Sequence, residues 1–176
     1  MLTLCTGNAA RSVMAATSLR ARRPDLQVAT AGTLVVDGQP MSIRTRAAIE
    51  RVGLAVPHHA SRQVHPPDLD AATVVLALAP EHVQWVRRTH PAAAARTVTL
   101  RRLVRHLEPA RTLAEQVASL RPEQVELEDW EEVVDPGGGE HDVFAACARE
   151  IDALVAELAP RLAPPISPRS AGTPAP

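Results

Sequence analysis

A strand that leads through a tight loop directly into a helix, at the start of the chain, constrains the fold most. Residues 2–5 are a short apolar run, and the turn sequence Thr6-Gly7-Asn8 ends it. Apolar residues then recur at helical spacing over residues 13–19, and this pattern stops near Pro24. The segment therefore predicts a β-strand, a loop and an amphipathic α-helix in immediate succession.

The same alternation of strands and helices continues along the chain. Three further apolar runs have the length and composition of strands: residues 26–31, 73–78 and 97–100. Helical patterns begin after Ser42, at Pro80 and near Glu140, and Gly53 is placed to end the first of them. Strands alternating with helices predict an α/β fold, in which helices cover both faces of a parallel sheet.

Composition divides the chain into one domain and a tail. Residues 1–160 carry the alternating pattern, with an insertion at about 101–132 where a helical pattern is broken by Pro109 and then becomes acidic and loop-like. Residues 161–176 are rich in proline and poor in core-forming residues, so we expect a disordered tail. A chain of 176 residues is long enough to bury one hydrophobic core.

Charge and cysteine content argue against several classes of function. The formal net charge is −1, which gives no indication of a nucleic-acid or membrane partner. No apolar run approaches the roughly 18 residues that span a bilayer. The two cysteines, Cys5 and Cys147, are far apart and form neither a disulfide framework nor a zinc-ligand pattern. We therefore expect a cytoplasmic protein, and the sequence leaves its oligomeric state open.

Cys5 and Arg11, with five residues between them, bound the segment that carries chemistry. Backbone N–H groups of a tight loop at a helix N-terminus form a cradle for an anion, and the helix dipole adds positive potential there. A phosphate in this cradle would have Cys5 beneath its phosphorus, while Arg11 could bind two of its oxygens in a bidentate fork. The remaining residues of the loop are the predicted substrate-binding set: Thr6, Gly7, Asn8, Ala9, Ala10 and Ser12.

The residue types within this loop agree with a nucleophilic cysteine. The positive potential favours the thiolate form of Cys5, which is the reactive form. Ser12 can donate a hydrogen bond to the sulfur, also when the sulfur becomes the leaving group. Gly7 and Asn8 tolerate positive φ, which a loop with inward-pointing amides requires. A cysteine and an arginine at this spacing also occur by chance, but the strand before and the helix after favour the functional interpretation.

Asp135 is the candidate for a second catalytic group. Phosphate transfer through a cysteine needs an acid for the leaving atom and then a base that activates water. Asp135 precedes Pro136 and the last predicted helix, and a carboxyl beside a bound anion suits the acid role. The residues alone favour a simpler interpretation, in which Asp135 belongs to the N-cap region of that helix. Asp129 and Asp142 are the alternative acids nearby.

The loop resembles the phosphate-binding loop of the low-molecular-weight protein tyrosine phosphatases, whose pattern is Cys-x-Gly-Asn-x-x-Arg-Ser. Three more segments within residues 1–160 are similar to elements of that family, in the same order: Ala29-Thr30-Ala31-Gly32-Thr33, Gly53-Leu54 with His59-Ala60-Ser61-Arg62-Gln63, and Val133-Val134-Asp135-Pro136. The resemblance implies a four-stranded parallel sheet with helices on both faces. It also implies hydrolysis of a phosphomonoester through a phosphocysteine, with Cys5 as nucleophile, Arg11 on the phosphate, Asp135 as general acid, and no metal or other cofactor.

The implied substrate is a phosphorylated protein, with phosphotyrosine as the first expectation, or a small phosphoester. The chain departs from the family pattern around the predicted pocket. Ala9 stands in the place of a larger residue and Ala10 in the place of a second cysteine, and Gly137-Gly138-Gly139 replaces the aromatic wall of the phosphotyrosine cleft. Trp85 and Trp130 could supply a substitute wall, although an isolated tryptophan more often has a packing or surface role.

Two other functions are compatible with the loop. Arsenate reductases of this fold share a Cys-Thr-Gly-Asn-x-x-Arg-Ser loop but depend on further cysteines, whereas this chain offers only Cys147, on the apolar face of the last predicted helix. A non-catalytic module that binds phosphate or a phosphopeptide would keep the same loop, and the glycines after Asp135 favour that alternative. The pair His58-His59 has no further ligands near it in the sequence, so no metal site is predicted.

Overall fold

A computed structural model describes residues 1–108 and 112–162 of the chain. Its strands are listed in chain order: β1 (Leu2–Cys5), β2 (Ala29–Gly32), β3 (Val75–Ala77) and β4 (Thr97–Thr99). They form one parallel sheet in the order β2-β1-β3-β4, so β1 is a central strand. The predicted four-stranded parallel sheet is confirmed.

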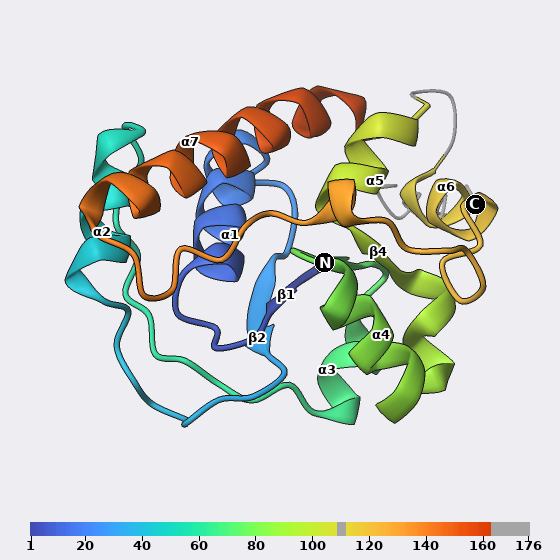
Figure 1. The fold of residues 1–176 in the computed structure, drawn as a ribbon. Helices are drawn as coiled ribbons and strands as arrows, with labels where there is room; N and C mark the ends of the chain where they lie inside the picture. The colour runs from blue at the N-terminus through green and yellow to red at the C-terminus, as the bar shows by residue number, and fades with distance from the viewer. Residues whose placement is uncertain (109–111, 163–176) are drawn as a thin grey trace, which may run out of the picture.

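The helices occupy both sides of this sheet. In chain order they are α1 (Arg11–Arg22), α2 (Ile43–Arg51), α3 (Pro66–Ala71), α4 (Pro80–Thr89), α5 (Leu100–His106), α6 (Leu113–Ser119) and α7 (His141–Leu158). Short 3₁₀ helices are η1 (Pro91–Arg96), η2 (Asp129–Glu131) and η3 (Ala159–Arg161). Figure 1 shows α7 crossing over α1 and α2, while α3 and α4 lie together on the other side.

Each face of the sheet buries its own hydrophobic cluster, because successive strand residues point to opposite faces. Leu2 and Leu4 of β1 pack with Leu69 of α3 and Val86 of α4. On the other face, strand and strand-end residues pack with α1, α2, α5 and α7; they are Val74, Leu76, Leu78 and Val98. Helices therefore cover both faces, as the sequence predicts.

Helix α1 differs from the predicted amphipathic helix because it is buried on all sides over its first turns. Residues 11–19 are all buried, since α7 covers the side of α1 that faces away from the sheet. Polar contacts fix this packing: Ser18 Oγ donates to Asp152 Oδ1 at 2.7 Å, and Arg22 donates to both oxygens of Asp152 at 2.7 and 2.9 Å. The contacts with α7 hold α1, and hence the loop in front of it, in place.

Several element boundaries follow from local contacts. Strand β2 begins at Ala29 rather than at residue 26, because the register pairs Leu2 of β1 with Ala29. Strand β4 ends at Thr99, whose hydroxyl accepts from Arg102 N at 3.2 Å and caps α5. The predicted N-cap Ser42 accepts from the backbone N–H of α2 at 3.1 Å. Gly53 follows α2 with a φ of +75°, a value that few other residues adopt.

The predicted insertion, about 101–132, is more tightly packed than its acidic composition indicates. The predicted break in its helical pattern lies between α5 and α6, around residues 109–111, which are outside the described part. Glu131 of η2 is fully buried, where it accepts from Arg102 Nη2 at 2.6 Å and from Thr99 Oγ1 at 2.6 Å. The acidic, loop-like composition of this segment gave no indication that Glu131 is buried.

The first two residues of the predicted tail pack against the domain. Leu162 is buried in the cluster beneath α7, and its carbonyl accepts from Arg23 Nη1 at 2.7 Å. Arg161 Nη1 donates to Val104 O at 3.0 Å. The predicted boundary at residue 160 is too early for these two residues, and residues 163–176 lie outside the described part. Among the described helices, none has the length and apolar character needed to cross a membrane.

Candidate active site

The loop from Cys5 to Ser12 lies between the carboxyl end of β1 and the first turn of α1. Because β1 has a parallel neighbour on each side, the segments that follow β2 and β3 begin at the same edge of the sheet. A pocket of about 200 Å³ opens there. It is lined by the loop, by Ser42 and Thr45 at the start of α2, by Asp135 and Gly137, and by Phe144 of α7.

The sulfur of Cys5 has a serine hydroxyl as its partner. Cys5 Sγ lies 3.0 Å from Ser12 Oγ, and both residues are buried. Asn8 Nδ2 donates to the same hydroxyl oxygen at 3.0 Å. Since the oxygen of Ser12 accepts from Asn8, its single proton is free to point at the sulfur. The hydroxyl can therefore donate to Cys5, as the sequence suggested.

Asn8 is the most constrained residue of the loop. Its φ is +48°, and its side-chain Oδ1 accepts from Arg62 N at 3.0 Å. His59 Nε2 donates to the backbone oxygen of Asn8 at 2.6 Å, which places the proton of a neutral His59 on Nε2 because a carbonyl only accepts. Burial lowers the pKa of His59 and so favours this neutral form. Of the two residues predicted to take positive φ, Asn8 does so and Gly7 does not.

Gly32 at the end of β2 allows the loop to approach the sheet closely. A Cβ at this position would collide with the backbone oxygen of Thr6 and would lie 2.9 Å from Asn8 N. Its backbone also joins the neighbouring segment, because Gly32 N donates to Arg62 O at 3.0 Å. In the sequence, Gly32 was noted within a segment similar to the family, and this contact was not identified because it depends on how two distant segments pack.

Arg11 and Asp135 are brought together over the pocket. The Arg11 side chain is almost completely buried, and its Nη1 donates to Val133 O at 3.2 Å. Its Nη2 donates to Asp135 Oδ2 at 2.5 Å and to Thr6 Oγ1 at 3.5 Å. A phosphate that enters the cradle would have to replace the Asp135 carboxylate as a hydrogen-bond partner of the Arg11 guanidinium group.

Asp135 does not cap the following helix. Helix α7 begins six residues later, with Glu140 at its N-cap position. Asp135 Oδ1 instead accepts from Gly137 N at 2.9 Å, and about half of the side chain is exposed. The N-cap interpretation is therefore wrong. Neither alternative acid lines the pocket: Asp129 begins η2, and Asp142 accepts from Val143 N at 3.0 Å.

The tryptophans do not form a substitute wall. The ring of Trp130 is covered by the guanidinium groups of Arg102 and Arg105, 5.5 and 4.6 Å from its centroid. Trp85 packs against His90, with the ring centroids 5.2 Å apart. Phe144 is the aromatic residue that lines the pocket.

Cys147 lies in the hydrophobic core, as expected from its place on the apolar face of the last helix. Burial first, and the nearby Glu150 second, raise the pKa of its thiol to about 12. Such a thiol stays protonated at neutral pH and is a poor nucleophile.

Two residues that sequence reasoning did not place in the site come from the start of α2. Thr45 Oγ1 donates to the backbone oxygen of Ala9 at 3.0 Å and lies 3.1 Å from Ser42 Oγ. Ser42 carried an N-cap signal, but nothing in the sequence indicated that this helix begins beside the loop. Within residues 1–108 and 112–162, no three His, Cys, Asp or Glu side chains are grouped as a metal ion would require.

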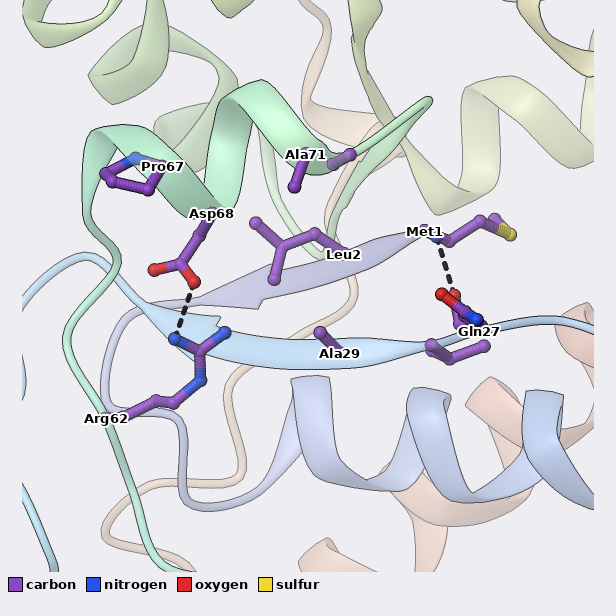
Figure 2. Close-up of a pocket in the computed structure, with 10 residues that line it drawn as sticks. Met1, Leu2, Gln27, Ala29, Arg62, Pro67, Asp68 and Ala71 are labelled. Carbon is purple, nitrogen blue, oxygen red and sulfur yellow. Dashed lines mark hydrogen bonds and ion pairs between the residues drawn. The ribbon is translucent and has the colours of Figure 1, made fainter.

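A larger pocket, of about 430 Å³, lies around Met1 at the start of β1 and beside α3. Figure 2 shows that its charged groups contact other groups of the protein. The amino group of Met1 donates to Gln27 O at 2.8 Å, and Arg62 Nη1 donates to Asp68 Oδ1 at 2.8 Å. No reactive cysteine or serine lines it, so the chemistry is assigned to the smaller pocket.

Comparison with known proteins agrees with this geometry. The model of the family described as low molecular weight phosphotyrosine protein phosphatase matches residues 1–118. The chain belongs to this family. The match confirms the predicted resemblance and the assignment to the cysteine-dependent phosphatases, which are hydrolases.

Three relatives cover nearly the whole chain. A protein-arginine-phosphatase of Geobacillus stearothermophilus is 28% identical over 163 residues, which are 92% of this chain and 95% of the relative. The solved structure of the YwlE arginine phosphatase from the same organism has a TM-score of 0.72 and 27% identity, over 91% of this chain and 90% of the other. A low molecular weight protein tyrosine phosphatase from T. tengcongensis has a TM-score of 0.72 and 25% identity, over 92% and 97% of the chains.

Proposed function

We propose that this protein removes phosphate from phosphorylated protein side chains, with Cys5 as nucleophile, Arg11 as phosphate ligand and Asp135 as general acid and base. The observation that carries the proposal is the position of Cys5 Sγ, 3.0 Å from Ser12 Oγ, in a loop that leads into the N-terminus of α1. Arg11, at the end of the same loop, lies beside Asp135 at the pocket.

The reaction would proceed in two displacements at phosphorus. In the first, the Cys5 thiolate forms the S–P bond while the bond from phosphorus to the leaving atom breaks, and Asp135 gives that atom a proton. In the second, the Asp135 carboxylate takes a proton from water, whose oxygen attacks the phosphocysteine. The S–P bond then breaks and the sulfur leaves as a thiolate, which the Ser12 hydroxyl stabilises by a hydrogen bond.

Phosphotyrosine and phosphoarginine are the two substrate classes that we consider. Phosphotyrosine follows from the family, and Phe144 offers one aromatic surface in the pocket. Phosphoarginine is favoured by the similarity to a protein-arginine-phosphatase over 92% of the chain. Ala9 has a small side chain and a glycine stands at 137, so Phe144 is the one aromatic surface among the pocket-lining residues that a phenol ring could contact.

Exposed apolar side chains near the pocket support a polypeptide substrate over a small phosphoester. Leu34 and Val36 follow the carboxyl end of β2, Ile43 follows the pocket residue Ser42, and Val134 precedes Asp135. Each of these four side chains is at least 63% exposed. Apolar residues gathered at one edge of a protein commonly mark a surface that contacts another chain.

The test is hydrolysis of p-nitrophenyl phosphate by the wild type, Cys5→Ser and Cys147→Ala. Cys5→Ser should abolish turnover and Cys147→Ala should retain it, because Cys147 is a core residue outside the pocket. Turnover by Cys5→Ser above a few per cent of the wild-type rate would refute the covalent mechanism. Peptides carrying phosphotyrosine or phosphoarginine, compared by kcat/KM, decide between the substrate classes.

The proposal includes a metal-independent reaction and a cytoplasmic location. Full activity in excess chelator is expected, because every step uses side chains of the chain itself. Both cysteines are free, which suits a reducing compartment and a nucleophile that must stay reduced.

A further inference from the structure

His82 is a buried histidine next to the phosphate loop that the proposed reaction does not use. It lies in the first turn of α4, directly after β3, and is 1% exposed. Its Nε2 lies 3.0 Å from Thr6 Oγ1 and 3.2 Å from Glu81 Oε1. Its other ring nitrogen, Nδ1, is buried and has no hydrogen-bond partner among the described residues.

The contacts of Thr6 determine where the proton of His82 resides. Glu81 Oε1 can only accept, and it lies 3.2 Å from both Thr6 Oγ1 and His82 Nε2. All three contacts are satisfied when Thr6 Oγ1 donates to Glu81 and accepts from His82. Nε2 therefore carries the proton, and Nδ1 presents an unpaired lone pair to the core. Burial first, and the charge of Arg11 second, lower the pKa of His82 to about 3, which agrees with a neutral ring.

Packing alone does not explain a histidine at this position. A buried ring nitrogen without a partner costs free energy that an apolar side chain of similar size would not cost. The hydroxyl that His82 binds belongs to the residue next to Cys5, and the same hydroxyl also accepts from Arg11 Nη2 at 3.5 Å. The contact thus connects α4 to both the nucleophile's neighbour and the phosphate ligand.

We propose that His82 is a positioning residue that fixes the nucleophile end of the phosphate loop through the hydroxyl of Thr6. The other part of the loop is held at Asn8, by His59 and Arg62. Without His82, the Thr6 hydroxyl would lose the nearer of its two donors, the other being Arg11 Nη2 at 3.5 Å, and the first amides of the cradle could turn away from a bound oxyanion. The role in catalysis rests on the proposed function, whereas the effect on oxyanion binding does not.

Three substitutions at residue 82 separate positioning from packing. A glutamine amide nitrogen can take the place of imidazole Nε2, an asparagine amide nitrogen can take the place of Nδ1, and leucine provides neither. Dissociation constants for orthovanadate and inorganic phosphate, measured by titration calorimetry, are the readout. The loss of one buried hydrogen bond predicts about tenfold weaker binding for His82→Leu and His82→Asn. His82→Gln should restore most of the affinity.

Thr6→Val gives an independent test, because it removes the hydroxyl and preserves the shape of the side chain. It should weaken oxyanion binding as His82→Leu does, and the double variant should be no weaker than either single variant. His106→Gln is the matched control, since His106 is exposed at the end of α5. It should bind both anions as the wild type does.

The outcomes distinguish this inference from the proposed function. Wild-type oxyanion affinity in His82→Leu or in Thr6→Val, or additive losses in the double variant, would overturn the positioning role. If His82→Leu does not fold, His82→Gln, His82→Asn and Thr6→Val still decide the matter. A wild-type protein that binds vanadate but hydrolyses no phosphorylated substrate would refute the proposed function and leave the role of His82 open to the same binding test.

Discussion

Replacing Asp135 by asparagine should move catalysis and phosphate binding in opposite directions. The variant cannot donate a proton to the leaving atom, so kcat on an alkyl or unactivated phenyl phosphate should fall by roughly 10²–10⁴. The loss should be smaller on p-nitrophenyl phosphate, whose leaving group needs little protonation. The Asp135 carboxylate also occupies Arg11 Nη2, at 2.5 Å, before phosphate arrives. Removing its charge should therefore make inorganic phosphate a tighter competitive inhibitor.

The expected gain in phosphate affinity follows from the exposure of the ion pair. Arg11 is buried but Asp135 is 52% exposed, so solvent screens the pair and its worth is about 0.2–1 kcal/mol. Releasing this competition corresponds to roughly 1.4- to 5-fold tighter phosphate binding. Steady-state kinetics with phosphate as inhibitor measures both quantities, with Asp142→Asn as the control outside the pocket. An equal loss of kcat on both substrate types would refute the acid role of Asp135. Weaker phosphate binding in the variant would refute the competition between Asp135 and phosphate for Arg11.

Four further predictions concern the support of the site and the core. Gly32→Ala should weaken vanadate binding and cost about 1–3 kcal/mol of unfolding free energy, because its Cβ would collide with Thr6 O; wild-type affinity would contradict this packing. Glu131→Gln should destabilise the fold by about 3 kcal/mol in urea denaturation at pH 7, since Arg102 loses its buried partner. Burial alone would raise the pKa of Glu131, but the hydrogen bonds from Arg102 and Thr99 together outweigh it and the pKa is lowered. The difference in unfolding free energy between wild type and Glu131→Gln should therefore shrink as pH falls below the usual value of 4.5. A difference that stays constant with pH would contradict this reasoning. In Cys5→Ser, iodoacetamide at pH 7 should label Cys147 far more slowly than it labels wild-type Cys5, because Cys147 lies outside the pocket and burial raises the pKa of its thiol to about 12. Equal rates would contradict this difference between the two thiols. Leu162→Ala should lower the unfolding free energy by about 2–5 kcal/mol in the same denaturation assay, because Leu162 is buried in the core. An unchanged unfolding free energy would show that Leu162 belongs to the tail.

The strands, the helices and the phosphate loop could be predicted because local sequence patterns indicate them. The strand, the turn and the helix of residues 2–22 follow one another directly, and alternating strands and helices predict a parallel sheet. The strand order β2-β1-β3-β4 was not predicted, because it depends on pairing between segments far apart in sequence. Local signals were also sufficient at Ser42 and Gly53, where capping and positive φ are properties of the residue itself.

The parts that could not be predicted depend on packing between distant segments. Glu131 belongs to an acidic stretch, and only the approach of Arg102 and Thr99 makes its burial possible. Thr45 and Gly32 contact the loop across gaps of many residues, with no pattern that reveals the contact. Asp135 was ambiguous for a similar reason, because its position at the pocket depends on its contact with Arg11, which is far away in the sequence.

The two histidines that contact the loop affect how the stability of the fold depends on pH. His59 and His82 each carry their proton on Nε2, and the fold lowers both pKa values, that of His82 to about 3. Above the ordinary value of 6.5 both are neutral whether the chain is folded or not. Below it, the unfolded chain binds protons that the folded chain excludes, so these residues make stability fall with falling pH. Because the neutral rings keep their contacts with Asn8 and Thr6 at neutral pH, protonation of these histidines should not loosen the loop there.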